Sequence, residues 1–205
     1  MKKNIYILTI CFLSYNIASA QKSGLSLLLG GDYWQTTFVN EEFFLGNVRF
    51  GSFTSIYGYR IGVSYHLQLI DKFSIATKIG YTLGGFDGYE HQYSVKINQG
   101  WLSLTPQYQL NRLVKLNAGG MLNFNFPNKN NFLQKNISHI NFGVSGGVSL
   151  ILNRFEVGCQ YTHFLNAYYD YKKLLPDLPT SQKQYWNVMG VFVAYRIFGK
   201  NPNNL

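Results

Sequence analysis

Six charged residues in this sequence have the types and the spacing to form buried ion pairs. Each stands in a stretch where bulky apolar residues alternate with small or polar ones, and the six are Asp32, Arg60, Lys78, Lys115, Glu156 and Arg196. An ion without a partner in a poorly hydrated interior costs several kcal/mol, so each acid requires a base. We expect one cluster that joins Asp32 to Arg60. The other joins Glu156 to Arg196, with Lys115 as a further candidate.

Catalytic and metal chemistry find little support in the sequence. Lipid A deacylases of outer membranes carry a His-x-Ser pair on a late strand, in which His is the base for the Ser nucleophile. The corresponding stretch here begins at His163 and has Leu165 at the nucleophile position. The other histidines, His66, His91 and His139, have no supporting Ser or Asp, and no metal-ligand spacing is present. We therefore expect no enzymatic activity, no cofactor and no metal site.

An alternation of side-chain type with a period of two predicts the strands that position the charges. The clearest case is residues 56–69, IYGYRIGVSYHLQL, where large apolar or aromatic residues alternate with Gly, Arg, Ser, His and Gln. Successive side chains of a strand point to opposite faces. The stretch exceeds the roughly 5–6 residues usual in soluble sheets, and a tilted strand needs about 9–11 to cross a bilayer. Bulky side chains therefore face lipid, and small or polar ones face a crowded lumen.

Eight stretches share this alternation. They are residues 25–33, 56–69, 73–83, 101–110, 114–126, 140–152, 155–165 and 185–198. The six charges fall on the inward positions. Pro106 interrupts the fourth stretch, and the loss of its backbone donor predicts a β-bulge there.

The connections between these stretches alternate in length. Tight polar turns lie at 71–72, 111–112 and 153–154, and long loops at 36–55, 87–96, 127–138 and 167–184. Short turns on one rim and long loops on the other are typical of outer-membrane barrels. The predicted fold class is all-β, an eight-stranded antiparallel up-and-down transmembrane β-barrel with periplasmic termini. The alternative is a soluble, lipocalin-like barrel with its bulky residues turned inward.

The first residues have the pattern of a secretory signal peptide. A basic start precedes an apolar run from Ile5 to Leu13, and small residues up to Ala20 form a cleavage site. We expect residues 1–20 to be removed and residues 21–205 to form one barrel domain in the outer membrane of a Gram-negative bacterium. Cys11 leaves with the signal, so Cys159 has no partner for an intrachain disulfide.

The composition favours a membrane-embedded chain. The formal net charge is +9, but the basic residues are dispersed, whereas nucleic-acid-binding proteins concentrate them in a stripe. Tyr and Phe number 16 each while charged residues make up only 13%, which suits the aromatic girdles of a transmembrane barrel. We expect outer-membrane lipid as the partner, no nucleic acid, and a monomer.

Five segments carry a resemblance to a known family. They are YTLGGF at 81–86, WLSLTPQYQL at 101–110, LNAGGMLNF at 116–124, YTHFLNA at 161–167 and VFVAYRIF at 191–198. With them, most of the mature chain resembles the bacterial outer-membrane β-barrel proteins often called PorT-like. The resemblance implies a small outer-membrane barrel. The family includes a component tied to protein secretion.

The predicted lumen and loops favour an interaction or structural function. An eight-stranded barrel encloses an interior that side chains just fill, and Arg60, Lys78 and Lys115 would occlude it. Loops 36–55 and 167–184 are rich in aromatic residues, which suggests contact with lipid head groups, loop packing or a protein partner. We predict a non-enzymatic barrel with an envelope-structural or interaction role. An accessory component of protein secretion and a narrow transport channel are the alternatives.

Overall fold

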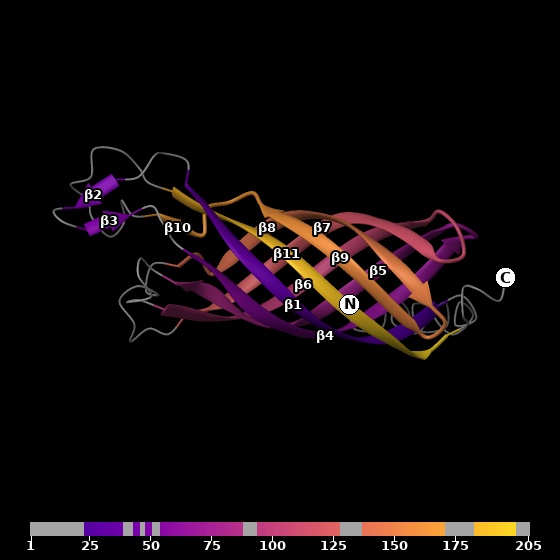
Figure 1. Cartoon of the computed structure of the whole chain (residues 1–205). Coiled ribbons are helices and arrows are strands. Elements are labelled where there is room, and N and C mark those ends of the chain that lie inside the picture. Colours follow the sequence, from indigo (N-terminus) through magenta and orange to yellow (C-terminus); the bar gives the residue numbers. More distant parts are fainter. Residues whose placement is uncertain are drawn as a thin grey trace, which may run out of the picture.

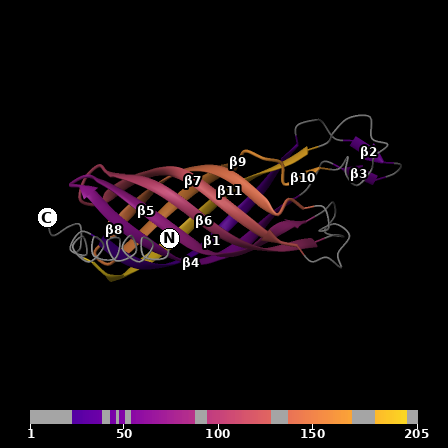
Figure 2. The ribbon, with the colours of Figure 1, turned by 180° about the vertical axis from the view of Figure 1, so that it is seen from behind.

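Eight long antiparallel strands form a closed barrel. The computed structural model describes residues 23–38, 43–45, 48–50, 54–87, 94–127, 137–170 and 183–199. The barrel strands are β1 (Ser23–Phe38), β4 (Thr54–Ile70), β5 (Phe73–Asp87), β6 (Ser94–Gln109), β7 (Val114–Phe126), β8 (Ile140–Leu152), β9 (Phe155–Phe164) and β11 (Lys183–Phe198). Each pairs with the next in this order, and β1 pairs with β11 to close the wall (Figure 1). The view from behind shows the same wall of tilted strands (Figure 2). The predicted fold class is confirmed.

Two strands, β7 and β8, have the predicted bounds, and most of the others are longer. The alternation predicts limits at Tyr33 and Trp101, but β1 continues to Phe38 and β6 begins at Ser94. The extra residues include Gln35 and Asn98, which interrupt the apolar pattern on the outer face. Their backbones still pair with the neighbouring strands, because ladder hydrogen bonds do not depend on apolar side chains. The pattern therefore marks only the part of each strand with an apolar outer face.

Pro106 does not cause a β-bulge, so that prediction is wrong. Gln107 lies opposite Asn117 in the same register as the pairs on the other side of the proline, and no residue is inserted. Instead, the backbones of β6 and β7 approach each other closely beside the proline. A Cβ on Gly119 would collide with the carbonyl oxygen of Leu104, so glycine lets the two backbones come together beside the missing donor.

Three short strands in the long connections escape prediction from the sequence. β2 (Phe43–Leu45) pairs with β3 (Val48–Phe50) in a separate two-stranded sheet, and β10 (Tyr169–Asp170) pairs with the beginning of β11. Both views place β2, β3 and β10 at the same end of the barrel, where the long connections lie (Figures 1 and 2). The rest of the predicted loops, the predicted signal peptide and His91 lie largely or wholly outside the described residues.

Side chains alternate between exposed and buried along the barrel strands. The exposed ones are mostly bulky and apolar, as at Tyr57, Ile79 and Val191, which are 78%, 57% and 61% exposed. Many of the buried ones are Ser, Thr, Asn and Gln. This arrangement matches the predicted orientation and excludes a barrel with its bulky residues turned inward. The described part of the chain contains no helix that is long and apolar enough to cross a membrane.

Candidate functional site in the barrel lumen

One lumen ion pair joins β1 to β4. Arg60 Nε donates a hydrogen bond to Asp32 Oδ2 at 3.0 Å, and Arg60 Nη2 lies 2.9 Å from Asp32 Oδ1. Such a two-point contact fixes the orientation of both side chains as well as their distance. Gly190 makes room for the carboxylate, because a Cβ there would lie 2.6 Å from Asp32 Oδ1. The structure thus brings these two residues together, in the half of the lumen nearer the long loops.

A second ion pair lies at the short-turn end of the lumen and links β7, β8 and β9. Lys115 Nζ donates to Glu156 Oε2 at 2.8 Å, and Ser149 Oγ donates to Oε1 at 2.8 Å. The direct contact with Glu156 is therefore made by Lys115, the further candidate from the sequence. Arg196, the first candidate, is partly buried on β11 and close enough to Glu156 to interact with it electrostatically.

His66 has a serine neighbour, contrary to the expectation from the sequence. Its Nε2 lies 3.0 Å from Ser64 Oγ and its Nδ1 lies 3.1 Å from Gln107 Oε1. Ser64 and His66 stand two positions apart on β4, so both side chains point into the lumen and can contact each other. The third group is an amide, which would orient the ring without the charge that stabilises an imidazolium. Ser64 is also only 1% exposed, so a substrate has no access, and the contacts form a structural network.

Lys78 differs from the other lumen charges because no described residue accepts a hydrogen bond from its Nζ. The side chain is 4% exposed, and Nζ lies 5.0 Å from the centroid of the Phe192 ring. Phe192 comes from β11, which is not a neighbour of β5, so the contact crosses the lumen. Gly158 makes room for that ring, since a Cβ there would lie 2.6 Å from Phe192 Cζ.

An apolar cluster fills much of the lumen, and the sequence reasoning missed it. Its buried members are Leu28, Trp34, Ile97, Trp101, Met121, Ile137, Phe164, Tyr168, Trp186, Val188, Phe192 and Ala194, hereafter the aromatic cluster. Trp186 packs edge-on against Trp34 with ring centroids 4.8 Å apart and stacks on Tyr168 at 3.3 Å. Burial raises the pKa of the Tyr168 phenol well above its ordinary value, so the ring stays uncharged.

Backbone hydrogen bonds connect the Tyr168 segment to the segments on either side of it at the long-loop end of the barrel. The N–H of Tyr168 donates to the carbonyl oxygen of Gln184 at 2.8 Å, and the N–H of Ser138 donates to the carbonyl oxygen of Tyr168 at 2.9 Å. These bonds connect the segment after β9 to β11 on one side and to the segment before β8 on the other. The Tyr168 ring, which stacks on Trp186, is thereby held in place at the long-loop end of the barrel.

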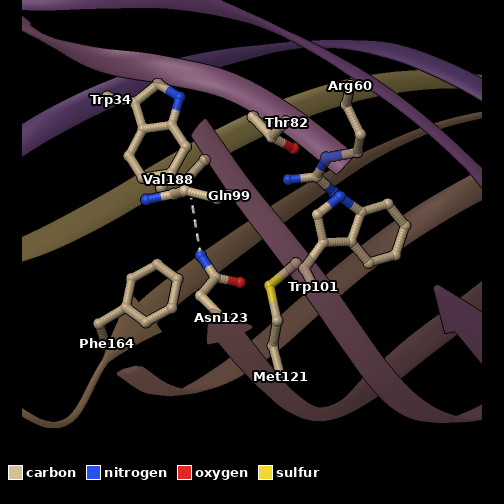
Figure 3. A pocket seen from close by; sticks show the side chains of 9 residues that line it. All are labelled: Trp34, Arg60, Thr82, Gln99, Trp101, Met121, Asn123, Phe164 and Val188. Atoms are coloured by element: carbon tan, nitrogen blue, oxygen red, sulfur yellow. Dashed lines mark hydrogen bonds between the residues drawn. The ribbon is translucent and has the colours of Figure 1, made fainter. Parts of the chain in front are cut away.

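Between the aromatic cluster and the first ion pair lies a hollow too narrow for a water molecule. It is lined by Trp34, Arg60, Thr82, Gln99, Trp101, Met121, Asn123, Phe164 and Val188 (Figure 3). The Arg60 guanidinium lies 5.3 Å from the centroid of the Trp101 ring, and Asn123 Nδ2 donates to Gln99 Oε1 at 3.3 Å. At this level the lumen is occupied by side chains rather than by a channel.

Glycines opposite the indoles are expected to be sensitive to substitution. A Cβ on Gly84 would lie 2.6 Å from Trp34 Cε2, so we expect Gly84→Ala to lose about 1–3 kcal/mol through overpacking. Urea titration of the refolded barrel, followed by tryptophan fluorescence, measures the loss. The matched control is Gly120→Ala, where a Cβ meets nothing within 4 Å, and no loss is expected. Equal behaviour of the two variants would contradict the tight contact.

His163, tested above as a candidate base, lies on the outer face of the barrel. Its Nδ1 lies 2.7 Å from Asn187 Oδ1, and its cross-strand neighbours are Asn187 and Val144, neither of which is a nucleophile. The arrangement of a hydrolase is therefore not assembled around this ring. Within the described ranges, no three His, Cys, Asp or Glu side chains gather to hold a metal ion.

Comparisons with known proteins find similar structures but no similar sequences. The sequence matches no protein-family model and no curated protein. The structure is similar to Neisserial surface protein A, with a TM-score of 0.51 and 13% identity over 84% of this chain and 97% of that one. The chain has the fold of a small transmembrane β-barrel. OprG of Pseudomonas aeruginosa (TM-score 0.45, 15% identity, 89% and 99% covered) is also similar. So is Ail of Yersinia pestis, solved with the heparin analogue sucrose octasulfate (TM-score 0.45, 12% identity, 86% and 99% covered).

Proposed function

We propose that this barrel resides in the outer membrane of a Gram-negative bacterium and has a non-enzymatic, envelope-structural or interaction role with a closed lumen. The observation that carries the proposal is the exposed apolar band on all eight strands. Leu29 on β1, Leu104 on β6 and Val191 on β11 are 52%, 57% and 61% exposed. An exposed apolar surface that encircles a protein is stable only against lipid or another apolar surface.

The filled lumen supports the closed state. Two ion pairs, the aromatic cluster and the Lys78–Phe192 contact all place buried side chains inside the barrel. Eight-stranded barrels have interiors that side chains just fill, so a general diffusion pore has no room here. We therefore assign the activity to the surfaces of the barrel and not to passage through it.

The two rims suggest an orientation. Each of the three short turns exposes one basic residue, namely Lys72, Arg112 and Arg154. These cations suit anionic lipid head groups on the periplasmic side of the membrane. Both termini would then be periplasmic, and a secretory signal at residues 1–20 would direct the export that this location requires. The long loops then face outward, and residues 36–55 and 167–184 are the candidates for contact with a protein partner. We propose a monomer, because the apolar band is satisfied by lipid alone.

Fractionation and conductance together test the proposal. The folded full-length protein is expected to sediment with outer membranes and to run at a different mobility on gels before and after heating. Reconstituted in planar bilayers, it is expected to give no steady conductance. A stable monomer in the soluble periplasmic fraction would overturn the membrane assignment. A large, constant conductance would overturn the closed lumen while leaving the membrane assignment intact.

An accessory role in protein secretion or a narrow transport path is the second candidate. The resemblance to PorT-like barrels favours secretion, and the resembling segments fall on β5, β6, β7, β9 and β11. Unpartnered amide atoms of Gln107, Asn117 and Asn141 on the β6–β8 wall favour hydration of that wall. Loss of secreted proteins on deletion of the gene, without leakage of small solutes, would support the secretion role over the structural one.

A further inference from the structure

Lys78 is a buried cation that no carboxylate of the described residues contacts directly. In the described part of the chain, the buried bases Arg60, Lys78 and Lys115 face only two buried acids. Both acids are in direct contact with other bases, at 2.9 Å for Asp32 and Arg60 and at 2.8 Å for Glu156 and Lys115. Glu156 attracts Lys78 from a distance, but it is shared with Lys115, and both Lys115 and Arg60 repel Lys78. The lumen therefore holds one buried positive charge that its carboxylates do not match by contact.

The contact with Phe192 does not compensate for the burial of this charge. The ring lies 5.0 Å from Lys78 Nζ and offers a cation–π attraction. That attraction is small beside the hydration that an ammonium group loses in a protein interior. None of the three N–H donors of Lys78 reaches a described acceptor. A ligand that accepts hydrogen bonds and carries negative charge would satisfy both needs at once.

Two further buried donors without partners lie on the side of Lys78 that faces the short turns. They are Gln107 Nε2 and Asn117 Nδ2, from side chains that are 1% and 5% exposed. Gln107 and Asn117 are direct cross-strand neighbours on β6 and β7. Such neighbours have Cβ atoms about 4.5–5.5 Å apart. Gln107 also contacts His66, which is close enough to Lys78 to interact with it electrostatically. The three donors thus lie on the inner faces of three adjacent strands, β5, β6 and β7.

We infer that Lys78, Gln107 and Asn117 form a binding site for a small inorganic anion of halide size inside the lumen. The ammonium group supplies the charge, and the two amides supply N–H donors. A halide accepts hydrogen bonds from any direction, so it needs no further orienting group. The site lies between the two ion pairs, where side chains fill the barrel, and this favours a single atom over an organic acid. The anion would hold β5, β6 and β7 together from inside.

Bromide, which replaces chloride and scatters X-rays anomalously, is the test ligand. Crystals of the full-length protein soaked in sodium bromide are expected to show an anomalous peak within hydrogen-bonding distance of Lys78 Nζ. In micelles at constant ionic strength, the thermal midpoint is expected to be higher in bromide or chloride than in sodium phosphate or gluconate. Lys78→Met is expected to abolish both the peak and the halide-specific shift.

Two controls make the result decisive. Lys72→Met removes a lysine from an exposed turn and is expected to leave both the peak and the shift unchanged. If Lys78→Met does not fold, the presence or absence of the anomalous peak beside Lys78 in the unmodified protein still tests the site. Bromide only against exposed residues, or equal midpoints in all four salts, would overturn the site. A higher midpoint in phosphate than in halide would also overturn it, because it would show that a larger anion is the ligand. None of these outcomes depends on where the barrel resides in the cell, so the proposed function stands or falls separately.

Discussion

The Ile79→Arg variant is expected to lose about 2–4 kcal/mol of folding free energy in a lipid bilayer. Ile79 lies near the middle of β5, points outward and is 57% exposed. Its cross-strand neighbours are Val63 and Leu102, so the arginine would stand in an apolar surface far from either rim. The cost arises because the guanidinium must reach a head group or draw water into the hydrocarbon region. Urea titration of refolding into phosphatidylcholine vesicles measures the loss.

The same substitution at the rim serves as the control. Ile70 ends β4 beside a short turn and is 66% exposed, so Ile70→Arg places the charge among the head groups. We expect a loss of about 0–1 kcal/mol there. Equal losses at both positions would contradict the depth assigned to Ile79. No loss at either position would mean that the exposed apolar face does not contact lipid.

The wall of the barrel could be predicted from the sequence because its pattern is local. A strand exposes every second residue to the same surroundings, so Ile61, Val63 and Tyr65 report the outer face without any knowledge of the partners. The inner face of the same strand held the ion-pairing Arg60, as the alternation required. The strand ends were less visible because residues near the long-loop rim, such as Gln35, are polar even on the outer face.

Contacts across the lumen could be predicted only in part, since they depend on register between strands that are far apart in sequence. Glu156 and Arg196 lie on paired strands near the same rim, which made them natural partners from their positions alone. Lys115 reaches Glu156 across β8, at 2.8 Å, through the tilt and stagger of three strands. No local pattern encodes that stagger. The sequence therefore predicts the Asp32–Arg60 pair, between adjacent strands, but not the direct contact of Glu156 with Lys115.

The aromatic cluster was missed although the alternation already pointed inward. Trp34 is two positions from Asp32, and Trp101 is two positions from Ser103, so both share the face of a lumen residue. A lumen expected to be polar gives no reason to predict that these indoles are buried in it. A further signal was available in glycines such as Gly84 and Gly62, whose missing side chains accommodate the indoles of Trp34 and Trp101. Large residues opposite glycines on the inward face indicate a packed interior.

The second large effect is expected at the ion pair near the short turns. Glu156 accepts hydrogen bonds from Lys115 and Ser149, and its side chain is only 9% exposed. Glu156→Gln leaves the Lys115 ammonium buried without a carboxylate, so we expect a loss of about 3–5 kcal/mol. Lys115→Met removes the only base in direct contact with the carboxylate among the described residues and is expected to cost a similar amount. Urea titration of the refolded variants gives both values.

The double variant Lys115→Met with Glu156→Gln separates the pair from its surroundings. Because neither buried charge remains, we expect it to be more stable than either single variant, and the non-additivity measures the coupling. Losses that simply add would contradict a direct ion pair, as would single variants close in stability to the unmodified protein.

Conductance of the same variants in planar bilayers shows whether the lumen is open. If the pair is purely structural, Glu156→Gln remains closed. A conductance that appears only in Glu156→Gln would instead show that this pair gates a narrow path, because the charge that holds β7 to β9 would then be the barrier that solutes meet.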